Sequence, residues 1–181
     1  FALPFIELDT FNDKEKFNLN FVDEIIVSCS WAKQVIKNAG IDKPIHVVPM
    51  GVDDQIFTPT AAQSTDDKYV FLTIGKWEKR KAHDTILYCF NQAFSQSDNV
   101  ELWMATSNPF LTPEEEKFWL NIVDSSPLRD KIKVFPRLPN HQAIAELIGY
   151  SHCGIYISRG EGWNMELLES MSMGKQVIAS N

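Results

Sequence analysis

Apolar residues along the chain fall into short runs and helical stripes separated by polar connections. From residue 69 onward, short apolar runs indicate buried strands near 69–74, 100–105, 131–135, 153–158 and 176–179. Between them, apolar residues spaced three and four apart predict helices near 82–95, 113–124, 140–149 and 164–173. Strands that alternate with helices need parallel crossovers, so the pattern predicts an α/β fold with a doubly wound parallel sheet.

The first part of the chain predicts a smaller α/β segment. Strands are expected near 24–28 and 45–48, with a helix between them that Ser30 caps. Residues 1–22 lack clean periodicity and are expected to be irregular. A polar stretch poor in apolar residues marks a linker. The predicted division of the chain is 1–60, a linker at 61–68, and a domain at 69–181.

A basic loop, Gly75–Lys81, follows the first of the later strands. Its sequence GKWEKRK has four positive charges and one negative, although the whole chain has a formal charge of −7. A basic loop between a buried strand and a helix is a candidate anion site. The alternative is a solvated surface loop. Lys79 and Arg80 are expected to be solvated and not to bind a ligand. Trp77 either stacks on a ligand or packs in the protein.

A second motif, Glu161–Glu169, follows the apolar run 154–157 and opens a helix that Gly174 closes. Free backbone N–H groups at a helix start favour anions, and carboxylates accept hydrogen bonds from hydroxyl groups. The combination suits a phosphorylated, hydroxyl-rich ligand such as a nucleotide sugar. The alternative is helix capping together with a solvated helix face.

Composition narrows the class of protein. With 44% hydrophobic and 12% aromatic residues the chain can bury a core, and it has no apolar run of the roughly twenty residues that span a bilayer. Three scattered cysteines fit a reducing compartment, so a cytoplasmic location is expected. The acidic balance argues against nucleic-acid binding. The four histidines lack metal-ligand spacing, so neither a metal site nor a cofactor is expected.

The two motifs, together with 23–28 and 47–53, resemble the retaining glycosyltransferases of group 1, which have two facing Rossmann-like domains (the GT-B architecture). The donor domain of that family has a Gly-Arg loop ending in Lys, and later two glutamates separated by seven residues. The resemblance implies that 69–181 is the nucleotide-sugar donor domain without its C-terminal elements. It also implies that 1–60 is the end of the acceptor domain and the crossover, with the rest of that domain outside the chain.

The resemblance assigns roles to particular residues. Lys76 and Lys81 would neutralise the departing diphosphate in place of a metal, Glu161 would bind hydroxyls of the donor sugar, and Glu169 would bind the ribose. The other donor-binding residues it implies are Gly75, Gly162, Trp163, Asn164, Met165, Arg137 and Leu138, with the last two in the nucleobase loop. Three positions depart from the family pattern and are read as a variant with a working site. Lys76 stands where the family usually has Arg, Asn164 replaces a glycine, and Glu166 replaces a common Pro.

The expected function of the complete protein is glycosyl (hexosyl) transfer from a nucleoside diphosphate-sugar to a carbohydrate, lipid or protein acceptor, with retention of configuration. This chain alone is expected to bind the donor and to be inactive without the remaining acceptor domain. One alternative is a non-catalytic nucleotide-sugar-binding or scaffold domain. A glycoside hydrolase is less favoured, because its paired carboxylates would not need a basic loop. The sequence does not identify the sugar, the base or the acceptor.

Overall fold

The computed structural model describes residues 1–63 and 67–180, which form two compact units. The smaller unit comprises Phe1–Gly51 and Gly160–Asn164, and the larger unit comprises Val52–Arg159 and Met165–Asn181. The predicted linker at 61–68 includes 64–66, which lie outside the described residues, so this assignment stays a prediction. Within the described part of the chain, no helix is both long and apolar enough to cross a bilayer.

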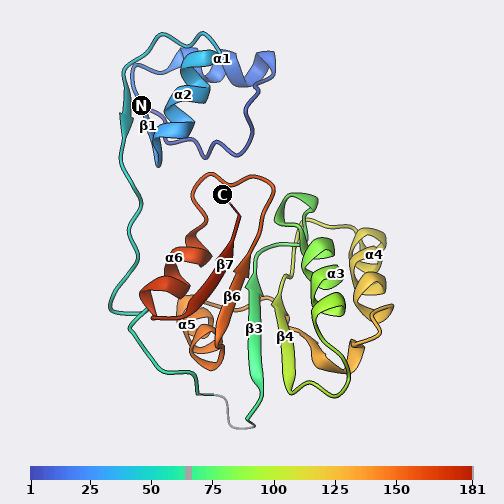
Figure 1. Cartoon of the computed structure of the whole chain (residues 1–181). Coiled ribbons are helices and arrows are strands. Elements are labelled where there is room, and N and C mark those ends of the chain that lie inside the picture. Colours follow the sequence, from blue (N-terminus) through green and yellow to red (C-terminus); the bar gives the residue numbers. More distant parts are fainter. Residues whose placement is uncertain (64–66, 181) are drawn as a thin grey trace. The chain divides into compact units, whose positions relative to one another are not determined.

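The larger unit is built on one parallel sheet, which confirms the predicted fold class (Figure 1). The spatial order β5-β4-β3-β6-β7 reverses direction between β3 and β6, so the sheet is doubly wound. The strands are β3 (Tyr69–Ile74), β4 (Val100–Ala105), β5 (Ile132–Val134), β6 (Cys153–Tyr156) and β7 (Gln176–Ala179).

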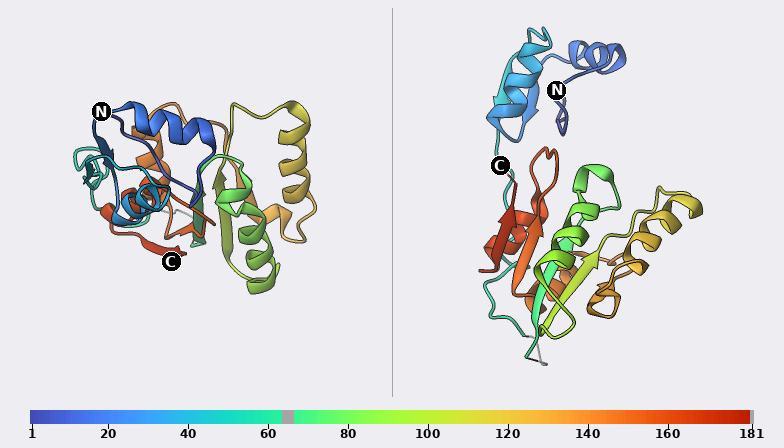
Figure 2. Two further views of the ribbon diagram at one scale, coloured as in Figure 1. Left: turned by 90° about the horizontal axis from the view of Figure 1, so that it is seen from above. Right: turned by 45° about the vertical axis from the view of Figure 1, so that its right-hand side comes forward.

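Helices cover both faces of this sheet (Figure 2). Side chains from α3 (His83–Ala93) and α4 (Pro113–Asp124) share one hydrophobic core with Leu102 and Met104 of β4. Side chains from α5 (His141–Tyr150) contribute to the other core, which includes Leu72 of β3. The remaining helical elements of this unit are α6 (Met165–Ser172) and two short 3-10 helices, η1 (Lys79–Lys81) and η2 (Arg129–Lys131).

Local signals in the sequence fix the boundaries of several elements in the larger unit. The helix α4 has the predicted bounds, because Thr112 and Glu115 form a reciprocal capping box and proline occupies the first turn. The strands β3 and β4 pair in register from Tyr69↔Val100 to Ile74↔Ala105. Both strands therefore end at the same level, and the loops that follow them lie side by side.

The smaller unit pairs β1 (Ile25–Val27) with β2 (Ile45–Val47) in parallel and carries α1 (Asp13–Phe21) and α2 (Ser30–Asn38). Two expectations were wrong here. The segment expected to be irregular contains α1, whose start has a capping box between Asn12 and Glu15 that the sequence displays. In addition, Ser30 is the first residue of α2 and not its cap, since Cys29 holds that position without a side-chain hydrogen bond.

Candidate functional site

A pocket of about 190 Å³ opens in the larger unit where three parallel strands end. The basic loop after β3 meets the segments after β4 and β5 there, next to the point where the strand order reverses. Ligands of doubly wound sheets bind in this position. The lining residues are Ile74, Gly75, Lys76, Ala105, Ser107, Pro136, Arg137, Leu138, Ile144 and Glu166.

Gly75 turns the chain out of β3 in a conformation that suits only glycine. Its φ is +145°, and its N–H donates to the carbonyl oxygen of Ala105 at 3.2 Å. A Cβ atom here would lie 3.2 Å from both Cδ and Cε of Lys81. The missing side chain therefore lets the alkyl chain of Lys81 cross the loop backbone.

The rest of the basic loop is fixed to the segment after β4. The N–H of Trp77 donates to the carbonyl of Thr106 at 2.8 Å, and its carbonyl accepts from Nδ2 of Asn108 at 3.0 Å. The indole is only 2% exposed and stacks on Trp119 with 5.2 Å between ring centroids. Trp77 is therefore a core residue, which decides between the two readings of it in favour of packing.

His83, the first residue of α3, holds the start of this loop by hydrogen bonds to its backbone. Its Nε2 lies 3.1 Å from the carbonyl oxygens of both Gly75 and Lys76, and the side chain is 1% exposed. Because both neighbours are acceptors, Nε2 carries the hydrogen. Sequence reasoning missed this residue, since a lone histidine at a helix start gives no signal until the loop is folded over it.

The two lysines assigned to the diphosphate both have acidic neighbours. Lys76 is exposed, with Nζ 3.5 Å from Oε1 of Glu78 and 5.3 Å from the ring centroid of Phe110. Nζ of Lys81 lies 3.7 Å from Oε2 of Glu166. Between them, Lys79 is exposed as expected, whereas Arg80 is half-buried and bonds to Glu78 at 3.0 Å.

The segment after β5 supplies a further part of the pocket wall. Arg137 is exposed, whereas Leu138 is half-buried against the core that contains Ile148 of α5. Both were assigned to a nucleobase loop, and both line the pocket. The structure thus brings Gly75, Lys76, Arg137 and Leu138 together.

The helix α6 carries two carboxylates three residues apart, which places them on neighbouring positions of one helix face. Glu166 lines the pocket, and Glu169 is 6% exposed one turn further along. Burial, with a contribution from the charge of Glu166, raises the pKa of Glu169 to about 7. Glu169 is not among the lining residues that the structure describes, so its assigned ribose contact stays a prediction.

The remaining assigned residues, Glu161 to Asn164, group with the smaller unit. There the carbonyl of Gly162 accepts a hydrogen bond from Oγ of Ser28 at 2.9 Å. Asn164 has a φ of +58°, a value that asparagine tolerates better than most residues, and this explains how it can stand in a glycine position. Met165 belongs to the larger unit as the first residue of α6.

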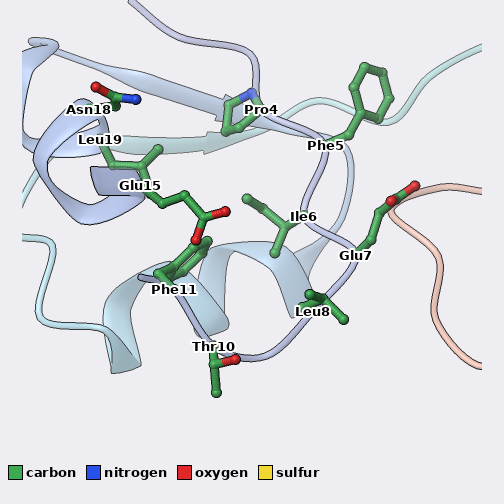
Figure 3. Close-up of a pocket in the computed structure, with 10 residues that line it drawn as sticks. All are labelled: Pro4, Phe5, Ile6, Glu7, Leu8, Thr10, Phe11, Glu15, Asn18 and Leu19. Atoms are coloured by element: carbon green, nitrogen blue, oxygen red, sulfur yellow. The ribbon is translucent and has the colours of Figure 1, made fainter. Parts of the chain in front are cut away.

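The smaller unit also has a pocket, of about 340 Å³, between the segment 4–11 and α1 (Figure 3). Its lining is mainly apolar and includes Ile6, Phe11 and Leu19. The carboxylate of Glu15, which lines the pocket, accepts a hydrogen bond from the N–H of Asn12 at 2.8 Å as part of the helix cap. No charged cluster like that of the larger unit occurs among the described lining residues.

Several solved structures share the fold. They include sucrose-phosphate synthase from Thermosynechococcus elongatus (TM-score 0.78, 20% identity, covering 91% of this chain and 42% of that one). Anabaena Alr3699/HepE in complex with UDP and glucose matches with TM-score 0.76 and 14% identity over 91% of this chain and 48% of that one. A glycosyltransferase from Rickettsia africae matches with TM-score 0.75 and 19% identity over 97% of this chain and 50% of that one. The chain spans about half of these proteins or less.

Comparison with curated proteins gives no match. A family model described as "Glycosyl transferases group 1" matches residues 54–181, which include the basic loop and the Glu161–Glu169 motif. This match covers well over half of the chain. The parallel sheet, the pocket at its strand ends and the family match agree, and the chain belongs to the glycosyl transferases of group 1.

Proposed function

We propose that the protein transfers a sugar from a nucleoside diphosphate-sugar to an acceptor with retention of configuration, and that this chain provides the donor-binding part. The observation that carries the proposal is the pocket at the ends of β3, β4 and β5, which is lined by Gly75, Lys76, Arg137 and Glu166. Cationic groups beside a backbone turn suit a diphosphate, and carboxylates nearby suit hydroxyl groups. The UDP and glucose in the Alr3699/HepE complex support a donor of this chemical class.

Each part of the donor has a proposed partner in this chain. Lys76 and Lys81 would stabilise the charge that develops on the diphosphate as the bond from the sugar C1 to the phosphate oxygen breaks. Arg137 and Leu138 would border the base, and Glu169 would accept hydrogen bonds from the ribose. On the strength of the sequence motif, Glu161 is proposed for hydroxyls of the donor sugar, and the N–H groups of Trp163, Asn164 and Met165 are proposed for the sugar or the diphosphate.

In the proposed reaction the acceptor oxygen forms a new bond to C1 and passes its proton to the departing phosphate, while the bond from C1 to the phosphate oxygen breaks and the nucleoside diphosphate leaves. The two lysines supply positive charge where a metal ion acts in other enzymes. The acceptor is proposed to be a carbohydrate, lipid or protein, bound mainly outside this chain. On this basis the chain alone binds nucleoside diphosphate weakly and transfers no sugar.

Calorimetric titration of the chain with UDP, GDP and ADP, and with their sugar conjugates, tests the proposal. We expect one base to be preferred, and we expect Lys81→Ala and Glu169→Ala to weaken binding. Glu146→Gln, on the exposed side of α5, is the control for a changed surface charge. Equal affinity of all variants, or no binding of any nucleotide at millimolar concentration, would remove the proposed function.

A further inference from the structure

The ammonium of Lys81 already has an anionic neighbour inside the pocket region. Its Nζ lies 3.7 Å from Oε2 of Glu166, and the two side chains are 11% and 25% exposed. A Cβ on Gly75 would lie 3.5 Å from the same Nζ, so the ammonium sits above a glycine that lines the pocket. Glu166 lines the pocket as well. Lys81 is not itself among the lining residues, so the pair adjoins the pocket through Gly75 and Glu166.

The geometry of this pair suits exchange. A distance of 3.7 Å is longer than a charge-assisted hydrogen bond. The two groups therefore interact mainly by attraction between their charges, without a short hydrogen bond. Partial burial reduces screening by water and salt, which leaves the Coulomb energy substantial. A phosphate oxygen that binds Lys81 comes within a few ångströms of the Glu166 carboxylate and is repelled by it.

This repulsion acts unequally on donor and product. In a nucleoside diphosphate-sugar both phosphates are esterified or bridged, whereas the released nucleoside diphosphate has a terminal phosphate whose further ionisation has a pKa of about 6. Near neutral pH the product therefore carries roughly one more negative charge than the donor. A fixed carboxylate beside the diphosphate site therefore weakens binding of the product more than it weakens binding of the donor.

Resting on the proposed function, we propose that Glu166 is a specificity-determining residue. It acts as an internal counter-ion that Lys81 exchanges for the donor's diphosphate, and it favours the nucleoside diphosphate-sugar over the free nucleoside diphosphate. In the ligand-free protein Glu166 compensates the charge of Lys81 in a half-buried position. After transfer, the same carboxylate promotes dissociation of the product.

The test compares Glu166→Gln with the wild-type chain by calorimetry at pH 8 and low salt, using UDP, UDP-glucose and uridine as probes. At pH 8 the terminal phosphate is ionised, and Glu169, with a pKa of about 7, is largely ionised too. We expect the variant to bind UDP on the order of tenfold more tightly and UDP-glucose about threefold more tightly, since one repulsive charge is removed at short range. Uridine affinity should stay unchanged.

Two controls separate this effect from others. Glu146→Gln removes the same charge from an exposed position on α5 and should change none of the three affinities by more than about twofold. The double variant Lys81→Gln/Glu166→Gln, compared with Lys81→Gln, measures the coupling. The gain in UDP affinity should shrink at least by half when Lys81 is absent.

The outcomes are distinct. An equal gain for UDP and UDP-glucose would overturn the discrimination between product and donor. A gain for uridine as large as that for UDP would show that Glu166 acts through Glu169 instead, and an undiminished gain without Lys81 would overturn the exchange. UDP binding that is equal in the wild type and Glu166→Gln overturns this inference alone. If UDP, GDP and ADP all fail to bind the wild-type chain, both the proposed function and this inference are overturned.

Discussion

The imidazole Nε2 of His83 lies 3.1 Å from the carbonyl oxygen of Gly75 and 3.1 Å from that of Lys76. One N–H group thus holds the two consecutive peptide units from which the basic loop leaves β3. The other ring nitrogen, Nδ1, has no hydrogen-bond partner among the described residues. Protonation would place a charge in this buried position, so burial lowers the pKa of His83 to about 4, although its two carbonyl partners act in the opposite direction.

Replacement of His83 should separate loop positioning from simple packing. Gln presents an Nε2 donor at the same distance along the side chain, whereas Leu removes the donor and leaves both carbonyls without it. We expect His83→Leu to weaken nucleoside diphosphate binding by roughly 1–2 kcal/mol and His83→Gln to restore most of it. Titration with UDP measures both. Equal losses in the two variants would contradict a role for this hydrogen bond.

His83 also predicts a pH dependence of stability. Its pKa is about 4 in the folded chain, below the ordinary 6.5, so the unfolded chain binds its proton more readily. The stability that the neutral ring supports is complete above about pH 6.5 and is lost as pH falls toward 4. Urea denaturation from pH 7 to 4 should show a smaller decline of the unfolding free energy in His83→Gln than in the wild type. Parallel curves would contradict the prediction.

Lys81→Ala should affect ligands according to their phosphates. Its proposed partner is the diphosphate, so UDP affinity should fall by about 1.5–3 kcal/mol while uridine affinity stays nearly constant. The alkyl chain of Lys81 also covers Gly75, and a structural effect would act on both ligands. Lys81→Met keeps this cover without the charge and is the matched variant. Equal losses for UDP and uridine would assign Lys81 to loop structure.

Glu169 should release a proton when it binds a ribose. Its pKa is raised to about 7 by burial and by Glu166, and hydrogen bonds from ribose hydroxyls favour the ionised form. Calorimetry of UDP-glucose binding at pH 6.5 in buffers of different ionisation enthalpy should therefore detect proton release that Glu169→Gln abolishes, because the esterified phosphates of UDP-glucose do not titrate near this pH. Glu169→Ala should cost about 1.5–3 kcal/mol of binding free energy. Release that persists in Glu169→Gln would exclude this carboxylate from the ribose contact.

A separate network away from the pocket should govern stability. The carboxylate of Glu101 lies 2.8 Å from Nζ of Lys68 and 2.7 Å from Nζ of Lys133, and it accepts from Nε1 of Trp103 at 2.8 Å. Burial alone would raise the pKa of Glu101, but these donors hold it at about 2. We expect Glu101→Gln to lower the unfolding free energy at pH 7 by about 1–3 kcal/mol without changing UDP affinity.

The pH dependence of that difference follows from the sign of the shift. Because the folded-state pKa of Glu101 is lowered from 4.5 to about 2, its contribution is present above about pH 4.5 and is lost as pH falls toward 2. Denaturation at pH 7 and pH 3 should show the difference between wild type and Glu101→Gln shrinking with acid. Glu146→Gln serves as the control of equal charge change. A difference that is constant with pH would show that packing, not charge, is responsible.

The sequence by itself determined the order of strands and helices in the larger unit, the parallel sheet and the location of the basic loop. These features follow from hydrophobic periodicity and from helix caps, such as that of Thr112 with Glu115. Both signals involve residues close together in the sequence, so they can be recognised without the folded structure. The capping box of Asn12 with Glu15 carries the same kind of signal, so α1 could have been predicted as well. The motif spacing also identified the family, because several motifs occur in the right order.

Only the tertiary structure decided which groups surround the site. It placed His83 under the carbonyls of the basic loop, sent Trp77 into the core against Trp119, and set Lys81 beside Glu166. These contacts join residues from different elements, and side-chain periodicity within one element says nothing about a partner in another. The pKa of Glu169 depends on burial and on a neighbouring charge, and both exist only once α6 packs on the sheet.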